Sequence, residues 1–393
     1  MDRISRRTFV GAAAAAGLGG LTWLTARSAG ASGHPPPTAR RAYVGGFTTG
    51  EYGLPGLPGI GVATIGSDGG LSVDGYREGI ENPSYLTLGP GGDRLYAVSQ
   101  TGDGHVHAFR LGADGWPEPL NAAPTDGATP VHLAVHPDGR HLVTVNYDSA
   151  SVAVHALSED GSIGESTDLV EHEGSGPDSV EQAAPHPHMA LFAPNGRDVI
   201  VPDKGNDHVY VYALDPDGGT LTERSRVLVG EGAGPRHAAF HPNGRHVYVS
   251  NELGSTVTVC EYDPEAGALT VGTSVSVAAP GADPRNAPSG VLVGPEGRFV
   301  YTADRGLDTL ASYAVAEGGA ALRLVESQPV STKAPGTRWP RDIALDPSGR
   351  YLYAANQAGQ CVTAHRVADD GRMAPVGAPV PVASPSCVLL SAR

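Results

Sequence analysis

Residues 235–251 read PRHAAFHPNGRHVYVSN, and this stretch decides the fold. A proline opens a short apolar run. A second proline, seven residues later, begins a turn that ends in Gly-Arg before another apolar run. Proline fixes φ at such a turn, and Asn or Gly supplies a positive φ. The stretch therefore predicts two antiparallel strands joined by a tight turn.

The same pattern recurs along the chain of 393 residues. A repeat of about 50 residues built from short strands is typical of a β-propeller, because each small sheet must stack on its neighbours to bury both faces. We predict a single all-β domain, a seven-bladed β-propeller. The complete copies open at Pro83, Pro130, Pro187, Pro235, Pro288 and Pro340, and a broken seventh copy opens at Pro385.

Each repeat supplies four antiparallel strands. After the two strands of the quoted stretch, residues 256–259 alternate as a third strand and residues 268–271 begin a fourth. The ends of the chain share the last blade, since residues 386–390 match only a first strand and residues 42–47 match a second. We predict that one C-terminal and three N-terminal strands close this blade, which removes free sheet edges. The propeller then spans residues 42–393.

Residues 1–31 have the pattern of a twin-arginine export signal. Arg6 and Arg7 precede an apolar stretch, and residues 29–31 offer a small-residue cleavage site. The apolar stretch has about 15 residues, short of the roughly 20 that span a membrane, which disfavours a permanent anchor. We expect export by the twin-arginine route to the periplasm, cell envelope or medium, and no stable membrane insertion after cleavage. Residues 32–41 are expected to form a flexible lead-in.

The composition restricts the partners. The 42 acidic residues outnumber the 27 Lys and Arg residues, for a net charge of −15 at pH 7, which argues against nucleic acid or an anionic membrane as partner. A small-molecule substrate and a monomeric state are expected. Cys260, Cys361 and Cys387 are odd in number and widely spaced, so we expect buried strand cysteines without disulfides and without a cysteine metal site.

Function is expected at one rim of the ring. The start of the first strand and the end of the second meet at the rim opposite the turn, and the residues there differ from blade to blade. The turn rim repeats in every copy. His136 and His241, which precede its prolines, are therefore interpreted as structural.

Two positions of the polar rim carry candidate residues. Sixteen residues after the opening proline the side chain is Asn or Asp in five copies. It either caps the turn after the second strand or contacts the substrate. The residue after it varies from copy to copy. With residues near the opening prolines, these positions give our candidates for substrate contacts: His237, Asn251, Asn146, Tyr147, Asp203, Lys204, Asp304, Arg341 and Asn356.

Four further residues are assigned to catalysis. Arg236 and Arg305 are planar groups suited to holding a carboxylate, a phosphate or a developing oxyanion. Glu252, expected beside Arg236, is either its ion-pair partner or a general base for water. His188 is either a proton shuttle or a structural histidine, and the nearby His186 leaves open which of the two belongs to the site.

No cofactor and no metal are expected. The nearest cluster of potential ligands combines His186 and His188 with residues 171–173 (Glu-His-Glu), and its spacing matches no common metal motif. The glycine-rich stretches are interpreted as turns, since none joins a strand to a helix as a phosphate-binding loop does.

Residues 232–237 (GAGPRH), 240–242 (FHP) and 249–253 (VSNEL) resemble the most distinctive stretch of the bacterial propeller lactonases, the 6-phosphogluconolactonase type. The resemblance covers residues 42–393 and implies a seven-bladed propeller that hydrolyses a sugar lactone without a metal. Other segments similar to the family in the same order are residues 43–45, 145–147, 187–188 and 302–306.

A fungal relative of this family, carboxy-muconate lactonizing enzyme, forms and opens a muconolactone ring instead. The His, Arg, Glu and second Arg proposed for its site match His188, Arg236, Glu252 and Arg305.

The expected substrate is a sugar-type or carboxylate-bearing lactone. A phosphorylated sugar lactone is a cytoplasmic metabolite, whereas this chain carries an export pattern, so an unphosphorylated aldonolactone is an equally good expectation. Two other functions use the same features. One is a propeller that binds a partner without catalysis, and the other is a lactonizing isomerase of the muconate type.

Overall fold

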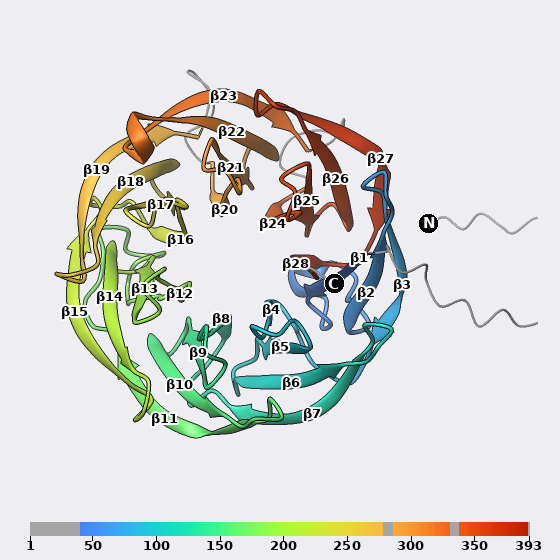
Figure 1. The fold of residues 1–393 in the computed structure, drawn as a ribbon, viewed down its shortest axis with the longest axis horizontal. Helices are drawn as coiled ribbons and strands as arrows, with labels where there is room; N and C mark the ends of the chain where they lie inside the picture. Colours follow the sequence, from blue (N-terminus) through green and yellow to red (C-terminus); the bar gives the residue numbers. More distant parts are fainter. Residues whose placement is uncertain (1–39, 278–285, 331–337, 392–393) are drawn as a thin grey trace, which may run out of the picture. The chain divides into compact units, whose positions relative to one another are not determined.

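The computed structural model describes residues 40–277, 286–330 and 338–391, which form a ring of seven four-stranded antiparallel sheets (Figure 1). The predicted seven-bladed propeller is confirmed. The predicted export signal and the lead-in up to residue 39 lie outside the described residues. Strand β1 (Arg40–Gly46) begins two residues before the predicted start of the propeller. No helix within the described part is long and apolar enough to cross a membrane.

Six of these sheets are continuous in sequence, and in each the first strand lies innermost (Figure 1). The first comprises β4 (Leu86–Leu88), β5 (Arg94–Ser99), β6 (His105–Leu111) and β7 (Pro117–Pro124). The second comprises β8 (Pro130–Val135), β9 (His141–Asn146), β10 (Ser151–Leu157) and β11 (Ile163–Glu171). The third comprises β12 (Leu191–Phe192), β13 (Asp198–Asp203), β14 (His208–Asp215) and β15 (Thr220–Leu228).

The fourth comprises β16 (Pro235–Phe240), β17 (His246–Asn251), β18 (Thr256–Asp263) and β19 (Ala268–Ser276). The fifth comprises β20 (Pro288–Val293), β21 (Phe299–Asp304), β22 (Thr309–Ala316) and β23 (Ala321–Pro329). The sixth comprises β24 (Pro340–Leu345), β25 (Tyr351–Asn356), β26 (Cys361–Val367) and β27 (Met373–Pro381).

The seventh sheet joins the two ends of the chain. Strand β28 (Pro385–Leu390) is innermost and is followed by β1, β2 (Ile60–Ile65) and β3 (Leu71–Arg77). Val44 of β1 pairs with Val388 of β28 in an antiparallel register. The predicted closure by one C-terminal and three N-terminal strands is therefore confirmed. Two 3₁₀ turns, η1 (Glu51–Gly53) and η2 (Glu317–Gly319), complete the described elements.

Neighbouring blades are held together by apolar clusters and by buried tyrosines of the second strands. The hydroxyl groups of Tyr43, Tyr96 and Tyr248 donate hydrogen bonds of 2.7–3.0 Å to turn carbonyls of the following blade. At the turn rim, His136 Nε2 lies 2.5 Å from the Gly196 carbonyl oxygen, and His241 makes the equivalent contact. These contacts fit the structural role expected for both histidines. The three cysteines are buried and form no disulfide within the described residues.

Candidate active site

The first strands of the blades lie innermost in the ring (Figure 1). In β8, β16, β20 and β24 the register of pairing shifts near the opening proline. Pro235 pairs with Asn251 and His237 pairs with Ser250, which leaves Arg236 as an extra, bulged residue. Arg341 is bulged in the same way between Pro340 and Asp342. A β-bulge re-aims the side chain of the extra residue. Repeat geometry therefore explains why both guanidinium groups line the same pocket.

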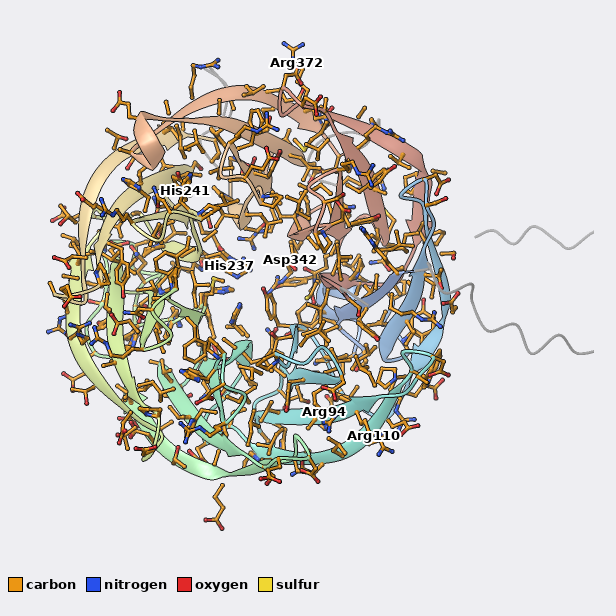
Figure 2. The ribbon with its side chains drawn as sticks, in the orientation of Figure 1. Arg94, Arg110, His237, His241, Asp342 and Arg372 are labelled. Carbon is orange, nitrogen blue, oxygen red and sulfur yellow. The ribbon has the colours of Figure 1, made fainter. Side chains whose placement is uncertain are left out.

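A polar pocket lies where these bulges meet. Figure 2 shows two of its lining residues, His237 and Asp342, near the middle of the ring. His188, Arg236 and Arg341, each directly after an opening proline, supply three more ionisable groups of its wall. The remaining lining residues are Ser84, Tyr85, Gln100, Val131 and Ser386. Since Ser84, Val131 and Ser386 also follow opening prolines, one position of the repeat builds most of the pocket.

Glu252 stands at the centre of three positive charges. Its carboxylate oxygens lie 2.9 Å from Arg236 Nε, 2.5 Å from Arg305 Nη2 and 3.4 Å from Lys204 Nζ. Burial disfavours a charge on Glu252, but Arg305, Lys204 and Arg236 together hold the pKa of its carboxyl well below its usual range. Glu252 is therefore an anion at neutral pH, and a poor proton acceptor while all three cations surround it.

Arg236 is buried, and one of its N–H donors is unpaired within the described part of the chain. Its side chain is 3% exposed, and its Nη1 has no hydrogen-bond partner among the described residues. Burial lowers the pKa of Arg236, and the neighbouring charge of Arg305 lowers it further. A buried N–H without a partner costs free energy that a ligand oxygen recovers when it accepts the hydrogen bond. Arg236 is therefore poised to bind a carbonyl, carboxylate or phosphate oxygen.

His188 is an uncharged imidazole beside these cations. Burial lowers its pKa well below the usual value, and the positive charges of Arg236, Arg341 and Lys204 add to the effect. Its Nδ1 is buried and has no hydrogen-bond partner within the part of the chain that the structure describes. A neutral imidazole with a vacant nitrogen can accept or relay a proton.

The structure separates the two neighbouring histidines. His188 lines the pocket with Arg236. His186 lies outside the lining of the pocket, where its ring stacks on Tyr147 at 4.2 Å between centroids and its Nδ1 lies 3.0 Å from the Tyr147 carbonyl oxygen. The His188 ring meets the edge of Tyr147 at 5.6 Å. His188 is thus the histidine that lies with the arginines.

Lys204 has two carboxylate partners, one of which the sequence did not reveal. Besides Glu252, Glu181 approaches its Nζ to 2.6 Å, and Lys204 also donates a 3.0 Å hydrogen bond to the Tyr147 hydroxyl. Glu181 belongs to a long connection outside the repeat pattern, and Gln182 fixes this connection by donating to the Lys204 carbonyl oxygen. No offset from an opening proline leads to Glu181, so the repeat carries no signal for it.

Arg341 differs from the other cations of the site. Its Nη1 donates a 3.3 Å hydrogen bond to Gln357 Oε1, and its guanidinium lies 5.3 Å from the centroid of Phe47. Within the described residues it makes no ion pair with a carboxylate. Its positive charge is therefore the least compensated in the pocket.

Sixteen residues after five of the opening prolines, the Asn or Asp side chain is buried and makes hydrogen bonds within the protein. All five side chains are at most 1% exposed. Asn251 Nδ2 donates to the hydroxyl groups of Thr256 and Thr258, and Asn356 Nδ2 similarly donates to Thr363. The Nδ2 groups are thus engaged by neighbouring hydroxyl groups, while the Oδ1 atoms of Asn146, Asn251 and Asn356 are buried without a hydrogen-bond partner among the described residues. The five residues are Asn146, Asp203, Asn251, Asp304 and Asn356.

Asp203 organises the segment that carries His188. Its Oδ1 accepts the backbone N–H of His186 at 2.7 Å and that of Gly205 at 2.9 Å, and its Oδ2 lies 2.6 Å from His172 Nδ1. His172 thus pairs with a carboxylate instead of joining the histidines of the suspected ligand cluster. Among the described residues, no group of three or more His, Cys, Asp or Glu side chains is arranged to hold a metal ion.

The sheets define a seven-bladed β-propeller, and the ends of its first and second strands bring a buried, mainly cationic cluster of side chains together at its centre. The chain belongs to the family described as "Lactonase, 7-bladed beta-propeller", whose model matches residues 41–390. The family resemblance seen in the sequence is thereby confirmed.

Relatives of known name and structure agree with this assignment. A 6-phosphogluconolactonase of Bacillus subtilis is 34% identical over 310 residues, which is 78% of this chain and 86% of the relative. The solved structure of a periplasmic gluconolactonase of Pseudomonas aeruginosa is similar with a TM-score of 0.81 and 27% identity, over 90% of this chain and 99% of the other. A protein from Lactobacillus plantarum is similar with a TM-score of 0.81 and 29% identity over the same shares.

Proposed function

We propose that the protein is a hydrolase that opens a sugar-type lactone at the mouth of the polar pocket lined by Arg236 and His188. The observation that carries the proposal is the grouping of Arg236, Arg305 and Lys204 around Glu252, with the uncharged His188 beside Arg236. The relatives named 6-phosphogluconolactonase and gluconolactonase support this class of reaction.

The reaction needs an activated water and a stabilised oxyanion. Water attacks the lactone carbonyl carbon, the carbonyl oxygen becomes an oxyanion, and the ring C–O bond then breaks. The ring oxygen leaves as a hydroxyl group after it takes up a proton, and the carboxyl group of the product loses one. Arg236 is the best placed donor for the oxyanion, since its Nη1 is buried without a partner among the described residues.

The electrostatics suggest how the proton moves. His188 is uncharged and has a vacant Nδ1, so it takes the proton of the attacking water and later gives it to the ring oxygen. Glu252 is held anionic by its three cations, and its main role is to fix Arg236, Arg305 and Lys204 in place. As negative charge develops beside Arg236 and Arg305, the pKa of His188 and of Glu252 rises, so both become better proton acceptors in the complex.

The charge balance of the site favours an uncharged or singly charged lactone. Lys204, Arg236, Arg305 and Arg341 bring four positive charges, and Glu252, Glu181 and Asp342 bring three negative ones when ionised, which leaves a net charge of +1. Arg341 remains without a carboxylate partner in the described part of the chain and is suited to a single acidic group or a sugar hydroxyl. An unphosphorylated aldonolactone fits this balance.

The location of the protein is part of the proposal. The Arg6-Arg7 pattern and the periplasmic gluconolactonase among the similar structures support export. We propose that the protein acts as an exported monomer. Fusion of residues 1–31 to a reporter, with Arg6 and Arg7 both changed to Lys as control, tests the route, and the elution volume of the purified protein tests the monomer.

A pH-stat screen of the purified protein tests the activity. The panel is gluconic δ-lactone, its 6-phosphate and a muconolactone, each with a protein-free control because lactones open spontaneously. Release of acid above the spontaneous rate is expected for the gluconic lactone. No catalysed release from any lactone would overturn the proposal and favour a binding propeller.

A further inference from the structure

Trp339 occupies a position where the other blades carry small or polar residues. The residue before the opening proline has a left-handed backbone in five blades, and in the other four it is Asn82, Thr129, Gly234 and Ser384. Trp339 adopts the same conformation with φ 49°. A bulky side chain is disfavoured there, whereas Asn and Gly adopt this conformation readily. The scaffold alone therefore does not account for a tryptophan at this position.

Tyr52 is a second aromatic residue in the same unfavourable conformation. It lies in η1 with φ 56° and ψ 24°, between two left-handed glycines, Gly50 and Gly53. Its side chain is among the few large apolar groups that are exposed, with 67% of the residue accessible. Exposed aromatic residues held in a strained backbone conformation are typical of binding sites.

The two rings meet although they come from different blades. Their centroids are 5.4 Å apart and their planes are inclined by 81°, so they form a corner. The backbone of Trp339 is fixed, since its N–H donates to Asp308 Oδ1 at 2.8 Å and its carbonyl accepts from Gln357 at 3.0 Å. These two hydrogen bonds therefore hold Trp339 in the position where its ring meets Tyr52.

The corner adjoins the proposed lactone site through Arg341. Trp339 lies two residues before Arg341, and Gln357, whose backbone binds Trp339, accepts the hydrogen bond of the Arg341 guanidinium. The Arg341 guanidinium lies over the ring of Phe47, in the closing blade whose loop carries Tyr52, and the charges of Glu252 and Glu51 both act on it. A ligand anchored near Arg236 and long enough to pass Arg341 reaches the aromatic corner.

We infer that Tyr52 and Trp339 form a subsite for a sugar ring, and that the substrate is the lactone of a disaccharide or longer oligosaccharide. The inference rests on the proposed lactone hydrolysis. A pyranose packs its C–H face on an aromatic ring while its hydroxyl groups meet polar side chains, and Glu51 and the Tyr52 hydroxyl supply these at the rim. The lactone ring then lies at the mouth of the polar pocket, against Arg236 and Arg341, and the glycosidically linked sugar lies on the corner.

The chemistry of such a substrate defines the reaction that supplies it. An oligosaccharide lactone forms when the anomeric carbon of its reducing end loses two electrons and two protons to an oxidant. The enzyme that makes the substrate is therefore a sugar oxidase or dehydrogenase acting on the reducing end.

Rates on two lactones test the inference. The probes are lactobionic δ-lactone, a disaccharide lactone, and gluconic δ-lactone, and the readout is the ratio of their kcat/KM values. The wild-type ratio is expected to favour the disaccharide by about tenfold, the size of a single stacking contact. Tyr52→Ala and Trp339→Asn are each expected to remove this preference. Trp339→Asn places at this position the residue that Asn82 supplies in another blade, so folding is not at risk.

The controls separate the inference from the proposed function. Tyr52→Phe keeps the ring and loses only the hydroxyl, so it should retain more of the preference than Tyr52→Ala does. Leu228→Ala, at an exposed apolar residue at the end of β15, leaves the ratio unchanged. Hydrolysis of gluconic lactone with no preference for the disaccharide, or a preference that survives both substitutions, overturns the subsite and leaves the proposed function standing. If the wild type hydrolyses neither lactone, both the proposed function and the subsite are wrong.

Discussion

Replacing Glu252 by Gln removes one negative charge and almost no volume from the centre of the site. The carboxylate is 12% exposed and faces Arg236, Arg305 and Lys204 within 3.4 Å. Removing one partner of a buried ion pair costs about 3–5 kcal/mol, because the remaining charge stays buried without compensation. Gln retains polar atoms, so we expect a loss of about 2–4 kcal/mol in the free energy of unfolding at pH 7.

The pH dependence of this loss has a definite sign. The pKa of Glu252 is depressed in the folded protein, so its stabilising effect is complete above the ordinary carboxyl pKa and disappears as the pH falls through the folded value. The difference between wild type and Glu252→Gln should therefore be constant through neutral pH and shrink in acid.

Urea unfolding with and without inorganic phosphate measures the effect. Phosphate is expected to stabilise Glu252→Gln more than the wild type, because it replaces the missing negative charge among the three cations. Glu181→Gln is the matched control. Glu181 is half exposed and contacts Lys204 alone among these cations, so its loss should cost under about 1 kcal/mol. A Glu252→Gln protein as stable as the wild type, with no extra response to phosphate, would refute the role of Glu252 as the anchor of the cluster.

Three further predictions concern the proton acceptor, the segment that holds it and the closure of the ring. Since burial and its cationic neighbours keep the pKa of His188 well below the usual value, kcat/KM for lactone hydrolysis should be constant from about pH 6 to pH 8 and decline only in stronger acid. An acid limb near neutrality would mean that another group accepts the proton. Asp203→Ala removes the acceptor for the backbone N–H groups of His186, Gly205 and Asn206 and the partner of His172; it should destabilise the protein by about 2–5 kcal/mol and lower kcat more than it changes KM, whereas equal stability and kinetics would rule out this positioning role. Deletion of residues 385–393 removes β28, with the buried Cys387 and Val388. Burial of such side chains contributes several kcal/mol, a large part of a typical free energy of unfolding of about 5–15 kcal/mol. The calorimetric melt should therefore lose its cooperativity, and a melt like that of the full chain would contradict the closure.

Much of the site follows from the repeat, since the hairpin brings the start of one strand beside the end of the next. The spacing of the repeat is enough to predict that Arg236 and Glu252 are neighbours, and the ion pair between them is present. The register shift is what turns Arg236 and Arg341 into the pocket. His188 holds the same position of the repeat and also lines the pocket, whereas His186 does not.

Other parts of the site lie outside what the repeat can predict. Glu181 reaches Lys204 from a connection that no other blade shares, and Tyr52 lies in the loop of the closing blade. The importance of Trp339 depends on the left-handed conformation before the opening proline, which the sequence does not show. The Asn or Asp that recurs sixteen residues after an opening proline is a different case. A residue type that recurs in five blades favours a turn cap, because substrate-binding residues differ from blade to blade whereas a turn cap is the same in each.

The steady-state rate of lactone opening by Arg236→Ala, set against the wild type in the same pH-stat, tests the central claim most directly. The claim is that the buried Arg236 guanidinium stabilises the oxyanion. Loss of one such donor costs about 3 kcal/mol, so kcat on gluconic δ-lactone should fall by about a hundredfold after subtraction of spontaneous opening. A variant that is folded and turns over gluconic lactone at the wild-type rate would contradict the account.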